Sequence, residues 1–189
     1  MAAEQGTDLC TDDAIARLAA IASDDDQAGL AEADRLIRSH PDDPRLHFLK
    51  GSLLAALTQY EAGEAAMTQA VAIAPGYEIA RFQLGLLQLS SGKPAAAETS
   101  LAPLTDLADD NPLKIFADGL MLLMRDQLAA AIDRLRAGIA ANATYPPLDR
   151  DMQMLIDETQ AKLDEARGEE PMSSTQQLLQ TYSSRQTRH

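Results

Sequence analysis

The sequence contains no tryptophan, and aromatic residues make up only 4% of its 189 positions. A hydrophobic core must therefore be filled by leucine, alanine, isoleucine and methionine, which suits closely packed helices better than a β-sandwich. Apolar residues reach 46%, so a real core can form. A chain of this length has room for one ordinary domain or for one short array of repeats.

Cysteine is almost absent as well. Cys10 is the only one, which excludes an internal disulfide and a cysteine-ligated metal cluster. No uncharged apolar run reaches the ~20 residues of a membrane-spanning helix. The first residues, MAAEQGTDLC, lack the basic start and apolar run of a signal peptide. We therefore expect a cytoplasmic protein without membrane insertion, and we expect Cys10 to be a small residue near a helix start.

Basic residues are few compared with acidic ones. The 16 lysines and arginines face 29 aspartates and glutamates, which gives a formal charge of −13. Nucleic-acid binding depends on clustered lysine and arginine, so we expect no nucleic-acid partner. The same balance disfavours anionic membrane surfaces, and it favours basic protein partners.

Motifs of catalysis are also missing. The sequence has no glycine-rich phosphate loop and no nucleophile elbow. His40 and His47 flank Asp42 and Asp43, but two helical zinc ligands with a third are not found, which favours a solvent-exposed loop. The aspartates at 24–26 lack the alternating ligands of a calcium loop and are interpreted as an acidic helix connection. We expect no enzyme activity, no metal and no cofactor.

What the sequence does contain is a repeat of 34 residues. A shift by this length superposes three glycines, and it superposes all of the phenylalanines: Gly51, Gly85 and Gly119; Phe48, Phe82 and Phe116. It also places Pro41 on Pro75. A period of this length is typical of solenoids.

Each repeat reads as two helices joined by a short turn. In residues 78–111, EIARFQLGLLQLSS is followed by GK, and Pro94 then stands at a first helical position. Both segments have the apolar spacing of a helix. The pattern predicts an antiparallel helix pair, and Pro103 should kink or shorten the second helix of this pair.

The repeated glycine predicts close contact between the two helices of a pair. Glycine inside a helix costs ~1 kcal/mol relative to alanine, so its recurrence implies a compensating packing advantage. The matching positions of the second helices are small: Gly63, Ala97 and Ala131. Larger side chains are expected to fill the space beside them: Met67, Leu101 and Leu135.

This pattern resembles the tetratricopeptide-repeat (TPR) family, whose 34-residue units have small residues at places 8 and 20 and proline at place 32. The resemblance covers units 44–77, 78–111 and 112–145, and a degenerate unit at 10–43 has Arg17 in place of the glycine. It implies an all-α fold, a right-handed superhelical α-solenoid of antiparallel helix pairs with a C-terminal capping helix. The sequence departs from the family at place 4, where an aromatic residue is replaced by His47, Arg81 and Ile115.

The remaining segments flank this TPR-like domain, which we expect over 10–167. Residues 146–167 are apolar on one face and charged on the other, as a capping helix requires. Residues 1–9 are expected to be a flexible N-terminus. Residues 168–189 are polar and poor in branched aliphatics, which predicts a disordered tail.

The resemblance implies that the first helices line a concave groove. Carried over residue by residue, the candidate partner-binding groove is apolar: Phe48, Ser52, Ile79, Phe82, Leu86, Leu89, Leu113, Phe116, Leu120, Leu123 and Met124. Two interpretations stay open, because these side chains either close the core between neighbouring helices or form an exposed patch for a partner. The basic clamp for acidic chaperone tails is absent, with Arg45 the lone cation in the groove.

These features favour a non-enzymatic scaffold or adaptor that binds an apolar or amphipathic segment of a partner protein. One alternative is a small secretion-type TPR chaperone for apolar clients. Another is a structural subunit that assembles into a homo-oligomer through the apolar groove or cap.

Overall fold

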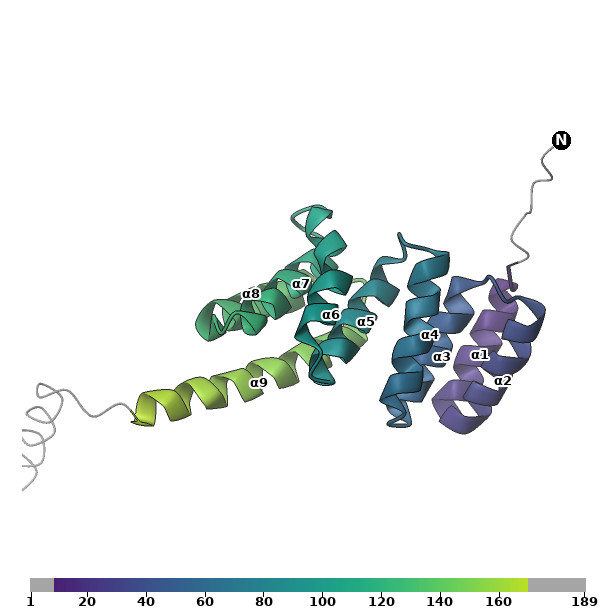
Figure 1. Cartoon of the computed structure of the whole chain (residues 1–189), viewed down its shortest axis with the longest axis horizontal. Helices are drawn as coiled ribbons and strands as arrows, with labels where there is room; N and C mark the ends of the chain where they lie inside the picture. Colours follow the sequence, from purple (N-terminus) through teal and green to yellow (C-terminus); the bar gives the residue numbers. More distant parts are fainter. Residues whose placement is uncertain (1–8, 170–189) are drawn as a thin grey trace, which may run out of the picture.

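The structure, a computed structural model, describes residues 9–169, and this part of the chain is almost entirely helical. No β-strand is present in residues 9–169. The helices are α1 (Asp12–Asp24), α2 (Asp26–Ser39), α3 (Pro44–Ala56), α4 (Tyr60–Ile73), α5 (Glu78–Ser90), α6 (Pro94–Leu101), the 3-10 helix η1 (Ala102–Asp106), α7 (Pro112–Met124), α8 (Leu128–Ala141) and α9 (Pro146–Glu169). Figure 1 shows antiparallel pairs stacked one after another along an elongated molecule. The predicted all-α fold built from helix pairs is confirmed.

The predictions for the two ends of the chain fall mostly outside the described range. Residues 1–8, expected as a flexible N-terminus, and residues 170–189, expected as a disordered tail, lie outside the described residues. The capping helix was expected over 146–167, but α9 continues to Glu169.

Prolines and capping side chains set where several helices begin. Pro94 starts α6, as the sequence predicts, and Pro112 starts α7. Asn111 caps α7 by accepting a hydrogen bond from the amide of Leu113 at 2.9 Å. Asp25 caps α2 in the same way, so the acidic run at 24–26 is a helix connection, as predicted.

The repeated glycines bring the helices of each pair close together. Each first-helix glycine lies against a large side chain of the second helix, too close to admit a β-carbon. The contacts, measured from that β-carbon position, are Gly51 with Met67 Cγ at 2.5 Å, Gly85 with Leu101 Cγ at 2.5 Å, and Gly119 with Leu135 Cδ2 at 2.6 Å. The predicted packing is confirmed, including the large residues that fill the adjacent space.

The turn between helix pairs is held by the residue at place 4. His47 Nε2 lies 2.7 Å from the carbonyl oxygen of Pro41, and the Arg81 side chain donates to the carbonyl oxygen of Pro75 at 3.0 Å. The two contacts are equivalent, because each spans six residues from place 4 to the preceding proline. The third residue, Ile115, is buried instead. The departures from the family pattern at His47 and Arg81 therefore have a repeated structural role.

Pro103 shortens its helix, as predicted. The α-helix α6 ends at Leu101 after 8 residues, whereas α4 and α8 each have 14 residues. The chain continues as the 3-10 helix η1, which carries the buried side chain of Leu104. The missing amide of proline and its ring do not fit an α-helix interior.

The loop between α2 and α3 carries a buried carboxylate. The sequence favours a solvent-exposed loop for the segment between His40 and His47. This is wrong for Asp43, which is fully buried, and the residues from Pro44 onward belong to α3. Its carboxylate accepts hydrogen bonds from the amide of Cys10 at 2.9 Å and from the side chain of Arg45 at 2.7 Å. Arg45 also donates to Asp12 Oδ1 at 2.7 Å. Asp43 thereby joins the start of α1 to the start of α3, and Cys10 lies just before α1 as predicted.

The Asp43 and Arg45 charges stabilise each other. Burial alone would raise the pKa of Asp43, but hydrogen bonds from Arg45 and from the amide of Cys10 lower it below its ordinary value. The hydrogen bond to Asp43 is the main cause that raises the pKa of Arg45. In the sequence prediction Arg45 is the lone cation of the groove. In the structure its guanidinium pairs with Asp43 and Asp12 of the same chain.

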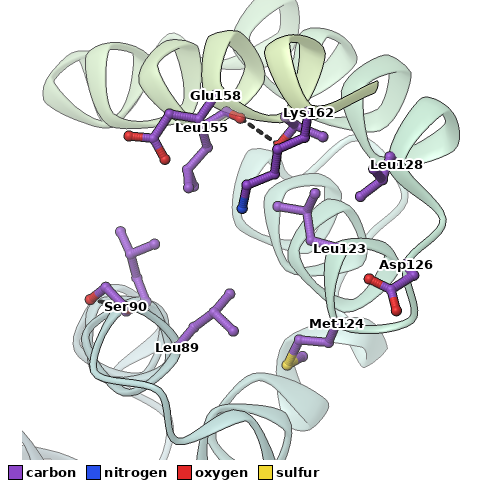
Figure 2. Close-up of a pocket in the computed structure, with 11 residues that line it drawn as sticks. Leu89, Ser90, Leu123, Met124, Asp126, Leu128, Leu155, Glu158 and Lys162 are labelled. Atoms are coloured by element: carbon purple, nitrogen blue, oxygen red, sulfur yellow. Dashed lines mark hydrogen bonds between the residues drawn. The ribbon is translucent and has the colours of Figure 1, made fainter. Parts of the chain in front are cut away.

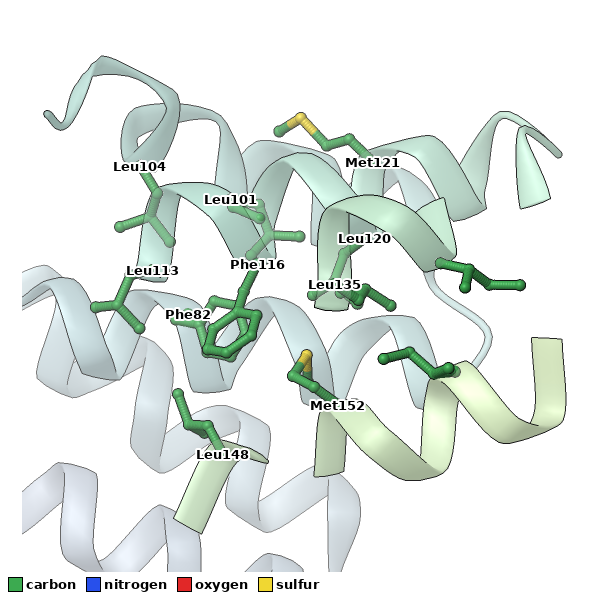
Figure 3. Close-up of a cluster of buried hydrophobic side chains, with 13 residues drawn as sticks. Phe82, Leu101, Leu104, Leu113, Phe116, Leu120, Met121, Leu135, Leu148 and Met152 are labelled. Atoms are coloured by element: carbon green, nitrogen blue, oxygen red, sulfur yellow. The ribbon is translucent and has the colours of Figure 1, made fainter. Parts of the chain in front are cut away.

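The main hydrophobic core lies in the second half of the chain and includes α9. Its residues come from α5, α6, η1, α7, α8 and α9: Phe82, Leu101, Leu104, Leu113, Phe116, Ala117, Leu120, Met121, Ile132, Leu135, Leu148, Met152 and Ile156. Figure 3 shows the rings of Phe82 and Phe116 together, with Leu148 and Met152 of α9 facing them. The α9 helix thus closes the core that α5 and α7 begin.

Candidate functional site

Four of the predicted groove residues are not accessible. Phe82, Leu113, Phe116 and Leu120 each have an exposed fraction of 0%. These four residues are therefore not part of an open groove, because α9 supplies apolar side chains to the same cluster. The two phenylalanine rings pack against each other with centroids 6.0 Å apart. For these four residues the core interpretation holds.

Three other predicted groove residues are half-buried and contact their own chain. The ring of Phe48 packs edge-on against the ring of Tyr77, with centroids 5.4 Å apart. Ser52 Oγ donates to the carbonyl oxygen of Phe48 at 3.1 Å. Ile79 packs against the main core. Each of these residues has a structural role within its helix or between neighbouring helices.

The last four predicted groove residues meet at one pocket of about 490 Å³. Leu86 and Leu89 come from the C-terminal half of α5, and Leu123 and Met124 from the end of α7. The complete lining is Leu86, Leu89, Ser90, Leu123, Met124, Asp126, Leu128, Leu155, Glu158, Thr159 and Lys162. We call this the α5/α7/α9 pocket. Figure 2 shows Leu89 facing Leu123 across it, with Leu155 on the α9 side.

The α9 side of the pocket was missed in the sequence prediction. The fully buried residues Leu148, Met152 and Ile156 follow a four-residue spacing along one line of α9. Leu155 belongs to a neighbouring line and is only half-buried. In the sequence prediction both lines form a single apolar face that is covered as a whole. The signal that could have found the open side is that α9 carries two apolar lines, of which the core needs only the one with Leu148, Met152 and Ile156.

Charged side chains border the pocket on two sides. Asp126 follows α7, while Glu158 and Lys162 lie on α9, and all three are exposed. Thr159 is buried, and its hydroxyl donates to the carbonyl oxygen of Leu155 at 2.6 Å. The pocket therefore has an apolar floor, and two carboxylates and one amine stand at its border.

A smaller hollow continues the surface toward α4. It has a volume of about 340 Å³ and is lined by Tyr60, Glu61, Ser90 and Ser91. Ser90 belongs to both hollows, so they are neighbours. Tyr60 is exposed to 46%, which is unusual for a large side chain in this structure. The accessible surface thus extends from α9 across the end of α5 to the start of α4.

Residues 9–169 show neither a metal-binding group nor a membrane-spanning helix. Within this range, no three side chains of His, Cys, Asp or Glu gather as a group that could hold a metal ion. No described helix combines the length and the apolar character needed to cross a bilayer.

Solved structures of repeat proteins match this architecture at low sequence identity. YrrB, described as a TPR protein with an unusual peptide-binding site, aligns with a TM-score of 0.56 and 16% identity over 80% of this chain and 76% of its own. The 41-end portion of MamA from Desulfovibrio magneticus RS-1 aligns with a TM-score of 0.55 and 16% identity, over 86% of this chain and 100% of its own. A MamA RS-1 ArsTM double mutant aligns with a TM-score of 0.55 and 14% identity, over 82% of this chain and 99% of its own. The chain has the tetratricopeptide-repeat fold.

No protein-family model and no curated protein matches the sequence. Within the TPR fold, α3, α5 and α7 are first helices, and α9 packs mainly against α8, the second helix of the last pair. The α5/α7/α9 pocket is therefore lined mainly by two first helices of the TPR fold and by the helix that follows the last pair, with Leu128 of α8 added at one side.

Proposed function

We propose that the chain is a non-enzymatic protein-interaction scaffold, and that its α5/α7/α9 pocket binds an apolar or amphipathic segment of a partner protein. The observation that carries the proposal is an open pocket with an apolar floor, lined by α5, α7, α9 and Leu128 at the start of α8. Its volume of about 490 Å³ lies within the ~300–1,000 Å³ of common ligand sites. The description of YrrB as having a peptide-binding site supports a peptide partner.

The driving force is burial of the pocket leucines. Leu86, Leu89, Leu123 and Leu155 are half-buried, so each has apolar surface left for a partner to cover. Covering such surface is worth ~25 cal/mol per Å² before the costs of ordering the partner are subtracted. Met124 is unbranched and flexible, which lets the pocket adapt to different apolar side chains.

The charge at the pocket border selects the partner's flanking residues. Asp126 and Glu158 outnumber Lys162 there, and the whole chain carries −13. A partner segment with lysine or arginine beside its apolar residues would gain association rate and orientation from this arrangement. The partner class is therefore an apolar segment with basic flanks.

Selection from a random dodecapeptide library displayed on phage tests this proposal with the full-length protein. We expect enriched peptides with two or more large apolar residues next to lysine or arginine. Leu89→Asp places a charge on the pocket floor and should weaken their binding by at least about tenfold. The proposal fails if no peptide is enriched, or if enriched peptides bind wild type and Leu89→Asp equally.

A further inference from the structure

One side of the α5/α7/α9 pocket is formed by α9, the last helix that the structure describes. Leu155, Glu158 and Lys162 of α9 line the pocket, and α9 ends at Glu169. Residues 170–189 come directly after this helix and lie outside the described residues, but their sequence is known. This segment is therefore covalently attached to the helix that forms one side of the pocket.

The segment is long enough to return to the pocket. From Leu155 to Glu169 the helix rises by about 21 Å, at ~1.5 Å per residue. The nine residues from Glu169 to Leu178 span up to about 30 Å when extended. Leu178 and the residues after it can thus turn back along α9 as far as Leu155. Covalent linkage over such a distance gives an effective concentration of about millimolar, so weak contacts suffice.

The segment also has the chemistry that the pocket selects. Residues 176–182 read QQLLQTY and carry Leu178, Leu179 and Tyr182 among uncharged polar residues. Residues 171–189 contain no aspartate or glutamate, and they include Arg185 and Arg188. An apolar pair with a basic flank matches a leucine-lined floor bordered by two exposed carboxylates.

We propose that residues 176–182 bind in the α5/α7/α9 pocket of the same chain and compete there with the partner segment. This inference rests on the proposed function, because it assigns an occupant to the same site. Leu178 and Leu179 cover the apolar floor, and the arginines lie toward the border that holds Asp126 and Glu158. A partner must displace this segment, which lowers the partner's apparent affinity.

Methyl NMR on the full-length protein with labelled methionine methyls tests the contact. Met124 lines the pocket, whereas Met154 lies on α9, is exposed to 55% and does not line it. Leu178→Ser with Leu179→Ser should shift the Met124 resonance and leave Met154 unchanged. The matched control, Gln176→Ala with Gln177→Ala, should keep the wild-type Met124 resonance. An unchanged Met124 in the leucine variant, or an equal shift in both variants, would overturn the proposal.

Dilution distinguishes binding of residues 176–182 in the pocket of their own chain from binding in the pocket of a second copy. The Met124 resonance should stay constant over a ~100-fold range of protein concentration, because an intramolecular contact does not depend on concentration. A shift toward the leucine-variant position on dilution would assign the occupant to another copy and overturn the intramolecular contact.

A binding measurement separates this inference from the proposed function. A library-selected peptide should bind the Leu178→Ser, Leu179→Ser variant about tenfold more tightly than wild type. If the peptide requires Leu89 but binds both proteins equally, the intramolecular contact is rejected and the proposed function stands. If no peptide requires Leu89 while Met124 responds to the leucine variant, the proposed function is rejected and the intramolecular contact stands.

Discussion

Single glycines set the distance between paired helices. At Gly85 a β-carbon would lie 2.5 Å from Leu101 Cγ, so Gly85→Ala must push a buried leucine aside. We expect this substitution to lower the free energy of unfolding by about 1–3 kcal/mol, measured by urea denaturation. The matched control is Gly76→Ala, where no atom lies within 4 Å of the added carbon. Its effect should stay within about 0.5 kcal/mol, and equal losses at both glycines would contradict the packing role.

A second prediction at the scale of single residues concerns Asp43. Asp43→Asn removes the charge that pairs with Arg45 and weakens the hydrogen bond from the amide of Cys10. We expect a loss of about 2–3 kcal/mol in the free energy of unfolding at pH 7. Asp42→Asn is the control, since that side chain is exposed, and it should change stability by less than about 0.5 kcal/mol.

The pH dependence of the Asp43 contribution follows from its lowered pKa. A carboxylate whose pKa is lower in the folded chain than in the unfolded chain stabilises the fold above the unfolded-state value of about 4. This stabilisation is lost as the pH falls through the folded-state pKa. The difference in unfolding free energy between wild type and Asp43→Asn should therefore shrink below pH 4. A constant difference from pH 7 to pH 3 would contradict the assignment.

At the scale of elements, α9 acts as part of the core rather than as a loosely attached cap. Met152 is fully buried in the main core, which includes residues of α5 and α7, whereas Met154 is exposed to 55%. Met152→Ala should lower the free energy of unfolding by about 2–4 kcal/mol because it leaves a cavity. Met154→Ala should change it by less than about 0.5 kcal/mol, as thermal and urea denaturation can measure. Similar losses would mean that α9 does not close the core.

The helix pairs could be predicted from the sequence, whereas the coverage by α9 could not. Contacts such as Gly119 with Leu135 lie within one repeat, so a fixed spacing of residue types reveals them. The position of α9 depends on the turn at 142–145, where the Asn142 side chain donates to Tyr145 O and Asp149 Oδ1, both at 2.7 Å. The backbone angles of this turn set the direction of α9, and small changes in them decide whether α9 reaches Phe82, which lies two repeats away. No spacing of residue types encodes these angles.

At the scale of the whole molecule, the buried side chains form separate clusters. Among the described residues, the main cluster has thirteen buried members, whereas the cluster that joins α1, α2 and α3 has five: Cys10, Leu18, Ala33, Leu36 and Leu46. A small third cluster, Met67, Leu84 and Leu87, joins the two halves. Beside it, Lys93 pairs with Glu64 at 2.6 Å, and Gln88 donates to the same carboxylate at 3.1 Å.

This division predicts unequal local stability along the chain. In repeat folds each pair is stabilised mainly by its neighbours, so the end with the smaller cluster should open first. We expect backbone amides of α1 and α2 to exchange with deuterium faster than those of α7, measured by mass spectrometry on the full-length protein. Equal protection of α2 and α7 would contradict a stability gradient that follows the clusters.

The most direct test of partner binding in the α5/α7/α9 pocket is isothermal titration calorimetry of one library-selected peptide against two neighbouring substitutions. Leu155→Ser alters the pocket lining, and Met154→Ser alters an exposed side chain outside it. We predict that Leu155→Ser weakens binding by about tenfold or more and that Met154→Ser leaves the affinity within about twofold of wild type. Equal affinities of the two variants, or a larger loss with Met154→Ser, would contradict binding in this pocket.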